Sequence, residues 1–282
     1  MKNRPFTAAS VVAAAALIAG AILLTSSFFR VSCSRPSFSS LTSLSHPDLM
    51  TATVRYATSR VVPQQSLAEI SESLAVLRKR APCNFLIFGL GHDSLMWYAL
   101  NAGGTTVFLE EDPSWYKTVL KGSPFLTAYH VEYRTHLSEA DELLQGWKQE
   151  KMCAPENAYL KGNQRCRLAL DNLPDVVYEK EWDFWIYALF NYLEKSKPLY
   201  YAAAPGRMAA IYSAMVMARA RKGEGDTDIF LHDVNRKVEK TFAKEFLCDK
   251  YRVGAVGRLW HFRVPPISRR GNETGDPSKK FC

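Results

Sequence analysis

The sequence predicts an α/β fold: a mostly parallel sheet covered by helices on both faces, with an antiparallel C-terminal hairpin, preceded by one transmembrane helix. Two observations predict the folded part. Short apolar runs alternate with helix-like segments, which implies a parallel sheet, and two strand-like runs flank Gly257 near the end of the chain. The third observation is that Ala8 to Phe29 contains no charged residue, since a bilayer-spanning helix needs about 20 apolar residues.

The N-terminal apolar run is interpreted as an uncleaved signal anchor. A cleaved signal peptide has a shorter apolar region of about 7–15 residues, and no clear small-x-small cleavage site follows this run; a cleaved signal is the alternative. The short basic N-terminus favours a lumenal position for the large domain behind it. We divide the chain into a cytosolic tip with the anchor (1–30), a serine-rich stem (31–47), one folded domain (48–267) and a polar tail (268–282).

The expected helices carry recognisable ends. Ser66 and Glu69 form a capping box at the start of the first helix, and Asp112 precedes a proline at the first position of the third. The helix expected over Pro205–Lys222 has apolar residues on almost every side, so we expect it to be buried. The helices are expected at Ser66–Arg80, Asp93–Ala102, directly after Asp112, Ser138–Gln149, Pro205–Lys222 and Arg236–Phe246.

The expected strands are short runs of apolar, β-branched or aromatic residues between turn residues. The first run is apolar almost throughout, as in a strand buried on both faces. The last two runs are separated by Gly257, so we expect them to pair as a hairpin. The strands are expected at Cys83–Phe88, Thr105–Leu109, Ala128–Tyr133, Ile229–Leu231, Tyr251–Val256 and Leu259–Val264. This combination suits the Rossmann-like fold of S-adenosylmethionine-dependent methyltransferases.

Composition limits the class of protein and of partner. The chain has 282 residues, of which 47% are apolar, which supports a buried core and excludes a disordered chain. Its formal net charge of +8 favours an acidic partner, and in a secretory lumen an acidic polysaccharide is a better candidate than nucleic acid. Six cysteines are present without a CxxC pair, which argues against a zinc ribbon. Cys153 and Cys166 are the preferred disulfide; buried free thiols are the alternative.

The turn after the first strand is the candidate cofactor site. Gly89 and Gly91 let the backbone bend sharply and let a ligand approach it, and Asp93 falls where the next helix needs a cap. Glu110 and Glu111 end the next strand, where a carboxylate accepts hydrogen bonds from ribose hydroxyls. A structural turn with surface carboxylates is the alternative.

The glycine pattern favours S-adenosylmethionine over a dinucleotide. A dinucleotide fingerprint has a third glycine three residues after the second, and here Ser94 stands at that place. A pyrophosphate is therefore less well accommodated than an adenosyl group without phosphate. His92, inside the turn, is a candidate contact to the adenosyl group or the acceptor, with a surface histidine as the alternative.

The segment "PCNFLIFGLGHDSLMWYALNAGGTTVFLEEDPSW" resembles the plant DUF579 xylan-biosynthesis family. The resemblance continues through "AAPGRMAAIYSAMVMARARKGEG", "TDIFLHDVNRKVEKTFAKEFLC" and "VGRLWHF". The family contains glucuronoxylan 4-O-methyltransferases and irregular-xylem xylan proteins. The segments "VPQQSLAEIS" and "NLPDVVYEKEWD" look closer to the irregular-xylem branch.

The resemblance implies a Golgi type II membrane protein of xylan synthesis in the secondary cell wall, with a methyltransferase-like domain. It implies S-adenosylmethionine as cofactor, an acidic xylan polysaccharide as partner alongside the Golgi membrane and other xylan-synthesis proteins, and no nucleic acid. In the methyltransferase branch it implies methylation of O4 of glucuronic acid side chains. No metal-ligating residues are assigned, and a need for a divalent metal is left open.

One segment departs from the family pattern. After "EWD" the family reads a strand such as "LIMIDAPKGYFPE", whereas this chain has "FWIYALFNYLEKSKPLYYA", Phe184 to Ala202. The acidic residue at the end of that strand, expected to face cofactor and acceptor, is therefore missing. The flanks resume the family pattern at once, which favours a mis-spliced segment; an unusual natural variant is the alternative.

The catalytic candidates are His232 and Asp233, at the end of the "IFLHD" strand. Methyl transfer to a hydroxyl often needs a base, and the imidazole has an unperturbed pKa near ~6.5. A capped strand-to-helix turn is the alternative for this pair. Arg207 is the candidate partner of a sugar carboxylate, with a solvated arginine as the alternative. Three functions are thus open: a methyltransferase, a non-catalytic accessory protein of xylan synthesis, and, remotely, an unrelated Rossmann oxidoreductase.

Overall fold

The computed structural model describes residues 49, 52–56, 59, 64–187, 207–267 and 280–282. The predicted signal anchor, the serine-rich stem, most of the tail and most of the unusual segment after residue 183 lie outside these residues. Within the described part, none of the helices combines the length and the apolar character that crossing a membrane requires.

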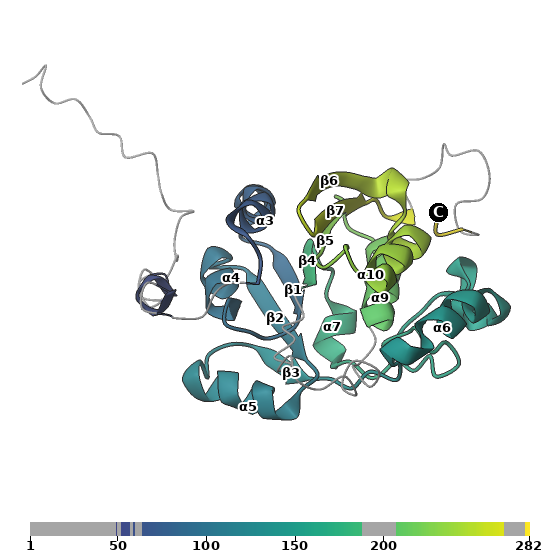
Figure 1. Cartoon of the computed structure of the whole chain (residues 1–282), viewed down its shortest axis with the longest axis horizontal. Coiled ribbons are helices and arrows are strands. Elements are labelled where there is room, and N and C mark those ends of the chain that lie inside the picture. Colours follow the sequence, from purple (N-terminus) through teal and green to yellow (C-terminus); the bar gives the residue numbers. More distant parts are fainter. Residues whose placement is uncertain (1–48, 50–51, 57–58, 60–63, 188–206, 268–279) are drawn as a thin grey trace, which may run out of the picture. The chain divides into compact units, whose positions relative to one another are not determined.

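The folded domain is built on one seven-stranded sheet with the order β3-β2-β1-β4-β5-β7-β6 (Figure 1). Strands β1 to β5 run parallel, and β7 is antiparallel to both β5 and β6. The predicted parallel sheet and C-terminal hairpin are therefore confirmed. The strands are β1 (Asn84–Phe88), β2 (Thr105–Glu110), β3 (Ala128–His130), β4 (Phe184–Tyr187), β5 (Thr227–Leu231), β6 (Arg252–Val256) and β7 (Leu259–Val264).

The strand order positions a ligand site. Strand order reverses between β1 and β4, because β2 and β3 lie on one side of β1 while β4 and β5 lie on the other. In open α/β sheets, ligands bind outside the carboxyl ends of the strands at such a switch point. The turn after β1 lies at this position.

Helices cover both faces of the sheet (Figure 1). Their bounds are α3 (Leu67–Arg80), α4 (Ser94–Leu100), α5 (Pro113–Gly122), α6 (Ala140–Gly146), α7 (Asp175–Glu179), α9 (Arg207–Ala220) and α10 (Lys237–Phe242). Alternate residues of a strand point to opposite faces, so Phe85 and Ile87 of β1 pack with α3, α4 and α5, whereas Leu86 and Phe88 pack with α9 and its neighbours.

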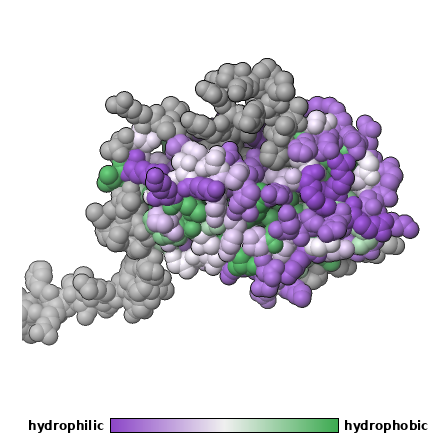
Figure 2. Space-filling model, turned by 90° about the horizontal axis from the view of Figure 1, so that it is seen from below, coloured by the Kyte–Doolittle hydropathy of each residue, from purple (hydrophilic) through white to green (hydrophobic). Residues whose placement is uncertain are grey.

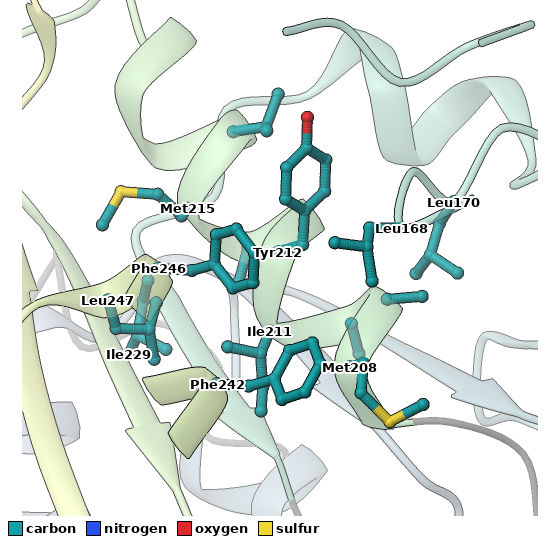
Figure 3. Packing of buried hydrophobic residues seen from close by; sticks show 14 of the residues in the cluster. Leu168, Leu170, Met208, Ile211, Tyr212, Met215, Ile229, Phe242, Phe246 and Leu247 are labelled. Carbon is teal, nitrogen blue, oxygen red and sulfur yellow. The ribbon is translucent and has the colours of Figure 1, made fainter. Parts of the chain in front are cut away.

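Helix α9 lies in the larger core, as its apolar sequence predicts. Figure 3 shows Met208, Ile211, Tyr212 and Met215 of α9 among side chains from the strand β5 and from the segment after α10. The Tyr212 ring is edge-on to Phe246, with ring centroids 5.3 Å apart. The described surface carries its large exposed apolar residues on separate segments, and Figure 2 shows only small hydrophobic areas between hydrophilic ones.

Three predicted elements differ in the structure. The helix expected over Arg236–Phe246 is α-helical only over α10 and continues as a π-helix over Ala243–Leu247. The third strand ends at His130, so Tyr133 lies beyond it. The helix expected over Ser138–Gln149 is divided into α6 and flanking 3-10 turns. The capping contact lies before the expected start, because the Glu139 carboxylate accepts a hydrogen bond from the backbone N–H of His136, 2.7 Å away.

Two disulfides stabilise the domain. Cys153 and Cys166 are bonded, as predicted, and a second bond joins Cys248 to Cys282. The second bond was not predicted. It holds the last residues against the domain, where Phe281 is buried beside Trp147 in the larger core. Residues 280–282, which the sequence assigned to the polar tail, are therefore held against the domain.

Candidate functional site

The turn after β1 is held in a conformation that suits glycine. Gly89 has φ of 112°, in the region that side chains disfavour, and its N–H donates to the carbonyl of Leu109, 2.7 Å away. The N–H of Gly91 donates to the hydroxyl of Ser94, 2.8 Å away. Ser94 thus supports the turn at the position where a dinucleotide site has glycine.

Glu110 ties β2 to this turn. One carboxylate oxygen accepts from the N–H of Leu90 at 2.7 Å, and the other accepts from the N–H groups of Glu111 and Asp112 at 3.0 and 2.9 Å. Burial raises the pKa of Glu110 against the effect of these three donors. Because backbone groups occupy both oxygens, Glu110 shapes the turn.

Glu111, unlike Glu110, has a carboxylate oxygen that no backbone N–H group bonds. Its Oε2 atom is buried and has no hydrogen-bond partner among the described residues. Burial, followed by the negative charge of Glu110, raises the pKa of Glu111 to about 8, and the positive charge of Arg207 opposes the rise. A desolvated carboxylate without a donor favours a ligand that brings one. Of the two predicted carboxylates, Glu111 is therefore the one suited to contact a ligand.

His92 and Asp93 lie between the turn and α4. The carbonyl of His92 accepts a hydrogen bond from the Tyr56 hydroxyl, and burial lowers the pKa of the His92 imidazole. The expected capping bond of Asp93 is not made; its carboxylate instead accepts from the indole N–H of Trp97 at 2.9 Å. Burial raises the pKa of Asp93 to about 7.

A second cluster lies at the end of β5. Nδ1 of His232 lies 3.2 Å from a carboxylate oxygen of Asp233, and Nε2 lies 3.5 Å from a carboxylate oxygen of Glu69. Nε2 is buried and forms no hydrogen bond within the described part of the chain. One ring nitrogen is thus oriented by a carboxylate, while the other faces Glu69 without a hydrogen bond. A general base needs one ring nitrogen free to take a proton.

Asp233 is the centre of an ion network. Its oxygens lie 3.1 Å from Arg207, 3.0 Å from Arg258 and 3.1 Å from Arg236. Burial opposes ionisation of Asp233, but the hydrogen bond from His232 and these positive charges outweigh burial and lower its pKa. This geometry favours Asp233 as a residue that positions His232. It does not cap the following helix, which begins at Lys237 after an N-cap at Arg236.

Arg207, at the start of α9, is buried with an exposed fraction of 3%. Its Nη1 atom pairs with Asp233 and with Glu239. The residue predicted to hold a sugar carboxylate is thus bonded to two protein carboxylates inside the domain. Among the residues that the structure describes, no group of three histidine, cysteine, aspartate or glutamate side chains is arranged to hold a metal ion.

The two clusters act on each other. Burial raises the pKa values of Asp93 and Glu111, and the charge of His232 opposes the first rise while that of Arg207 opposes the second. All the predicted site residues therefore lie along the carboxyl edge of β1, β2 and β5. Sequence reasoning missed Tyr56, Tyr133 and Glu69 as neighbours of this site. Glu69 was visible as a capping residue, whereas nothing local indicated that the other two reach the site.

Comparisons with known proteins show which proteins the chain is similar to. A family model described as IRX15/IRX15L/GXM matches residues 68–262. Arabinogalactan O-methyltransferase 2 of Arabidopsis thaliana is 52% identical over 96% of this chain and 93% of its own length. Glucuronoxylan 4-O-methyltransferase 1 of the same plant is 46% identical over 83% of this chain and 79% of its own.

Protein IRREGULAR XYLEM 15 of Arabidopsis thaliana is 34% identical over 77% of this chain and 64% of its own length. The chain is thus more similar to the named O-methyltransferases, opposite to the branch that its short segments indicated. Among solved structures, the O-methyltransferase from Bacillus cereus in complex with SAH is 14% identical, covering 77% of this chain and 89% of that one, with a TM-score of 0.36. That score is too low to support a fold assignment, which rests on the strand order.

Proposed function

Because the chain belongs to the IRX15/IRX15L/GXM family, we propose that it is an S-adenosylmethionine-dependent O-methyltransferase of a plant cell-wall polysaccharide. The observation that carries this proposal is the buried Oε2 atom of Glu111, which has no hydrogen-bond partner among the described residues and follows β2 beside the switch point of the sheet. Relatives named as O-methyltransferases support the reaction class.

The residues present fit the cofactor. Glu111 accepts hydrogen bonds from ribose hydroxyls, which supply the donor that its buried oxygen lacks. Gly89 keeps the turn free of a side chain, and Glu110 fixes the turn through its backbone bonds. When bound, S-adenosylmethionine supplies a methyl group that an oxygen nucleophile can attack. His92 and Asp93 follow the same turn, directly before α4.

The acceptor hydroxyl must lose its proton, and His232 is the proposed base. Its Nε2 atom is available, while Asp233 orients the ring from the other side. Burial raises the pKa of Asp93 to about 7, so its carboxyl group exchanges a proton near neutral pH. Asp233 stays ionised, because its arginine neighbours stabilise the carboxylate, and it therefore positions the base.

The proposed acceptor is glucuronic acid in an acidic wall polysaccharide, methylated at O4. Arabinogalactan is the first candidate, because identity and coverage are higher for the relative named for it than for the glucuronoxylan enzyme. Glucuronoxylan, the acceptor that the sequence resemblance implied, is the second. A net charge of +8 is suited to either acidic polymer.

A Golgi membrane location with a lumenal domain is part of the proposal. Disulfides form and persist in oxidising compartments, and four of the six cysteines are paired. The uncharged run from Ala8 to Phe29 supplies the proposed anchor. Other xylan-synthesis proteins are proposed partners on the resemblance alone.

An accessory role without catalysis is the second candidate function. The sequence that follows strand β4 favours this role. The strand lies between β1 and β5, at the centre of the sheet, yet the sequence after it reads Ala188-Leu189-Phe190 where the family pattern has Asp-Ala-Pro. Within β4, the indole nitrogen of Trp185 is buried and makes no hydrogen bond among the described residues.

The deciding experiment uses the full chain in detergent. We expect calorimetric binding of S-adenosylmethionine and transfer of a labelled methyl group to arabinogalactan more than to glucuronoxylan. A matched variant restores the family pattern as Ala188→Asp, Leu189→Ala and Phe190→Pro. Transfer only by this variant supports the accessory role for the natural chain, and absence of cofactor binding in both contradicts the proposed function.

Residues 52–56, which precede the first strand in the chain, contact the cofactor turn and the helix after it. The Tyr56 hydroxyl donates to the carbonyl of His92, and Ala52 packs against α4 through Leu95 and Ala99. Replacing Tyr56 with phenylalanine is expected to weaken cofactor binding about 5-fold, because a net hydrogen bond is worth about 1 kcal/mol. Titration calorimetry measures the change.

Tyr178→Phe is the matched control for this variant. Tyr178 also bonds backbone groups, at Leu170 and Leu173, but away from the turn. It is expected to lower the stability of the protein without changing the affinity for the cofactor. Equal affinities in the wild type and the Tyr56 variant would show that the Tyr56 hydroxyl does not shape the turn.

A further inference from the structure

Tyr133 carries a polar group that nothing in the fold accounts for. It lies beyond the end of β3, the strand beside β2, and only 9% of the residue is exposed. Its hydroxyl is buried and forms no hydrogen bond among the described residues. Leaving a buried hydroxyl unpaired costs about 1–3 kcal/mol, so the group needs a partner from outside the described chain.

The hydroxyl shares its surroundings with Glu111. The carboxylates of Glu111 and Glu110 are the charges that, after burial, most raise the pKa of Tyr133, and Arg207 opposes them. Glu110 is bonded to backbone N–H groups. Glu111 retains a buried oxygen without a donor. Two unpartnered polar groups, which follow the ends of the neighbouring strands β2 and β3, therefore lie close to each other.

The chemistry of the two groups selects the ligand. An ionised carboxylate only accepts hydrogen bonds, whereas a phenol hydroxyl donates one and also accepts. A ligand hydroxyl donates to the carboxylate and accepts from the phenol, so it satisfies both protein groups. A second carboxylate only accepts hydrogen bonds, so it leaves an ionised Glu111 without a donor.

We propose that Tyr133 and Glu111 together form the subsite for the ribose hydroxyls of the cofactor, with Tyr133 as a cofactor-binding residue. The inference rests on the proposed function. It adds Tyr133, which belongs to none of the sequence motifs that predicted the site. The Tyr133 hydroxyl donates to one ribose oxygen, and Glu111 accepts from the ribose hydroxyls. Each buried group thereby gains the partner that it lacks in the free protein.

The test measures binding of S-adenosylhomocysteine to the full chain by calorimetry, so that no turnover is needed. Tyr133→Phe is expected to bind about 5- to 10-fold more weakly, and Glu111→Gln about 10- to 100-fold more weakly. With the 2′,3′-dideoxy form of the ligand, which lacks both hydroxyls, the Tyr133 variant and the wild type are expected to bind alike.

Thermal unfolding of the ligand-free protein separates binding from a structural role. Removing an unpaired buried hydroxyl relieves a desolvation cost, so Tyr133→Phe is expected to keep or raise the melting temperature. The matched control is Tyr212→Phe, because the Tyr212 hydroxyl is also buried but donates to the carbonyl of Cys153 at 3.0 Å. That variant is expected to melt at a lower temperature and to bind the ligand unchanged.

The outcomes are distinguishable. If the wild type binds and Tyr133→Phe binds equally well, the inference is overturned while the proposed function stands. A Tyr133 variant that melts earlier but keeps its affinity overturns the inference in the same way. If the wild type binds no S-adenosylhomocysteine, both the inference and the proposed function are overturned.

Discussion

Replacing Arg207 with methionine is expected to lower the free energy of unfolding by about 3–5 kcal/mol, because it leaves a buried ion pair with one partner removed. The guanidinium lies against Asp233 and Glu239, whose side chains have exposed fractions of 6% and 2%. Without it, two buried carboxylates lose a shared cation. Chemical denaturation of the ligand-free protein measures the loss.

Arg167→Met provides the control for this variant. Arg167 also pairs with two carboxylates, Glu139 and Glu142, but its side chain is 41% exposed, so a loss within about 1 kcal/mol is expected. If Arg207 serves the sugar carboxylate alone, its variant will instead retain stability and show only a raised KM for the polysaccharide.

Replacing Asp228 with asparagine is also expected to cost about 3–5 kcal/mol. Asp228 is fully buried at the start of β5 and accepts from Arg80 at 2.6 Å, His261 at 2.7 Å and Arg263 at 3.0 Å. The variant removes the negative charge that these groups share. Cofactor affinity should stay unchanged, because this residue lies at the edge of the sheet opposite the site.

The same carboxylate predicts a pH dependence. Burial opposes ionisation of Asp228, but the hydrogen bond from His261 and the charge of Arg80 outweigh it and lower the pKa of Asp228 below its ordinary value. A lowered folded-state pKa means that the stabilisation is present above the unfolded pKa and is lost as the pH falls through the folded one. The wild type should therefore lose its advantage over Asp228→Asn in acid.

The exposed pair of Asp249 and Arg252 supplies the control, since Asp249→Asn at a half-exposed surface site should change stability by less than about 1 kcal/mol. An Asp228 variant as stable as this control at neutral pH would show that the buried network contributes no net stabilisation.

Much of this fold could be predicted because its signals are local. The capping box of α3, the proline of α5 and the hairpin around Gly257 each depend on residues close in sequence, and each is present. The third strand was predicted to reach Tyr133, whereas β3 ends at His130. A run of strand-forming residues shows that a strand can form, but not where its pairing with the neighbouring strand ends. Here β3 pairs with β2 only as far as His130.

The site was less predictable, because its roles depend on contacts distant in sequence. Glu110 and Glu111 are adjacent and chemically identical, yet only the first meets backbone N–H groups of the turn. Likewise, the fourfold pairing of Asp233 involves Arg258 and Arg207, which no local pattern connects to it. Cys282 could not be assigned a partner from spacing alone.

The bond between Cys248 and Cys282 makes the stretch between them a closed covalent loop. A single proteolytic cut inside that loop therefore releases no peptide: the two pieces stay linked until a reductant separates them. Mass measured without reductant will record such a nick only as one added water molecule, so limited proteolysis of this protein has to be analysed with and without thiol.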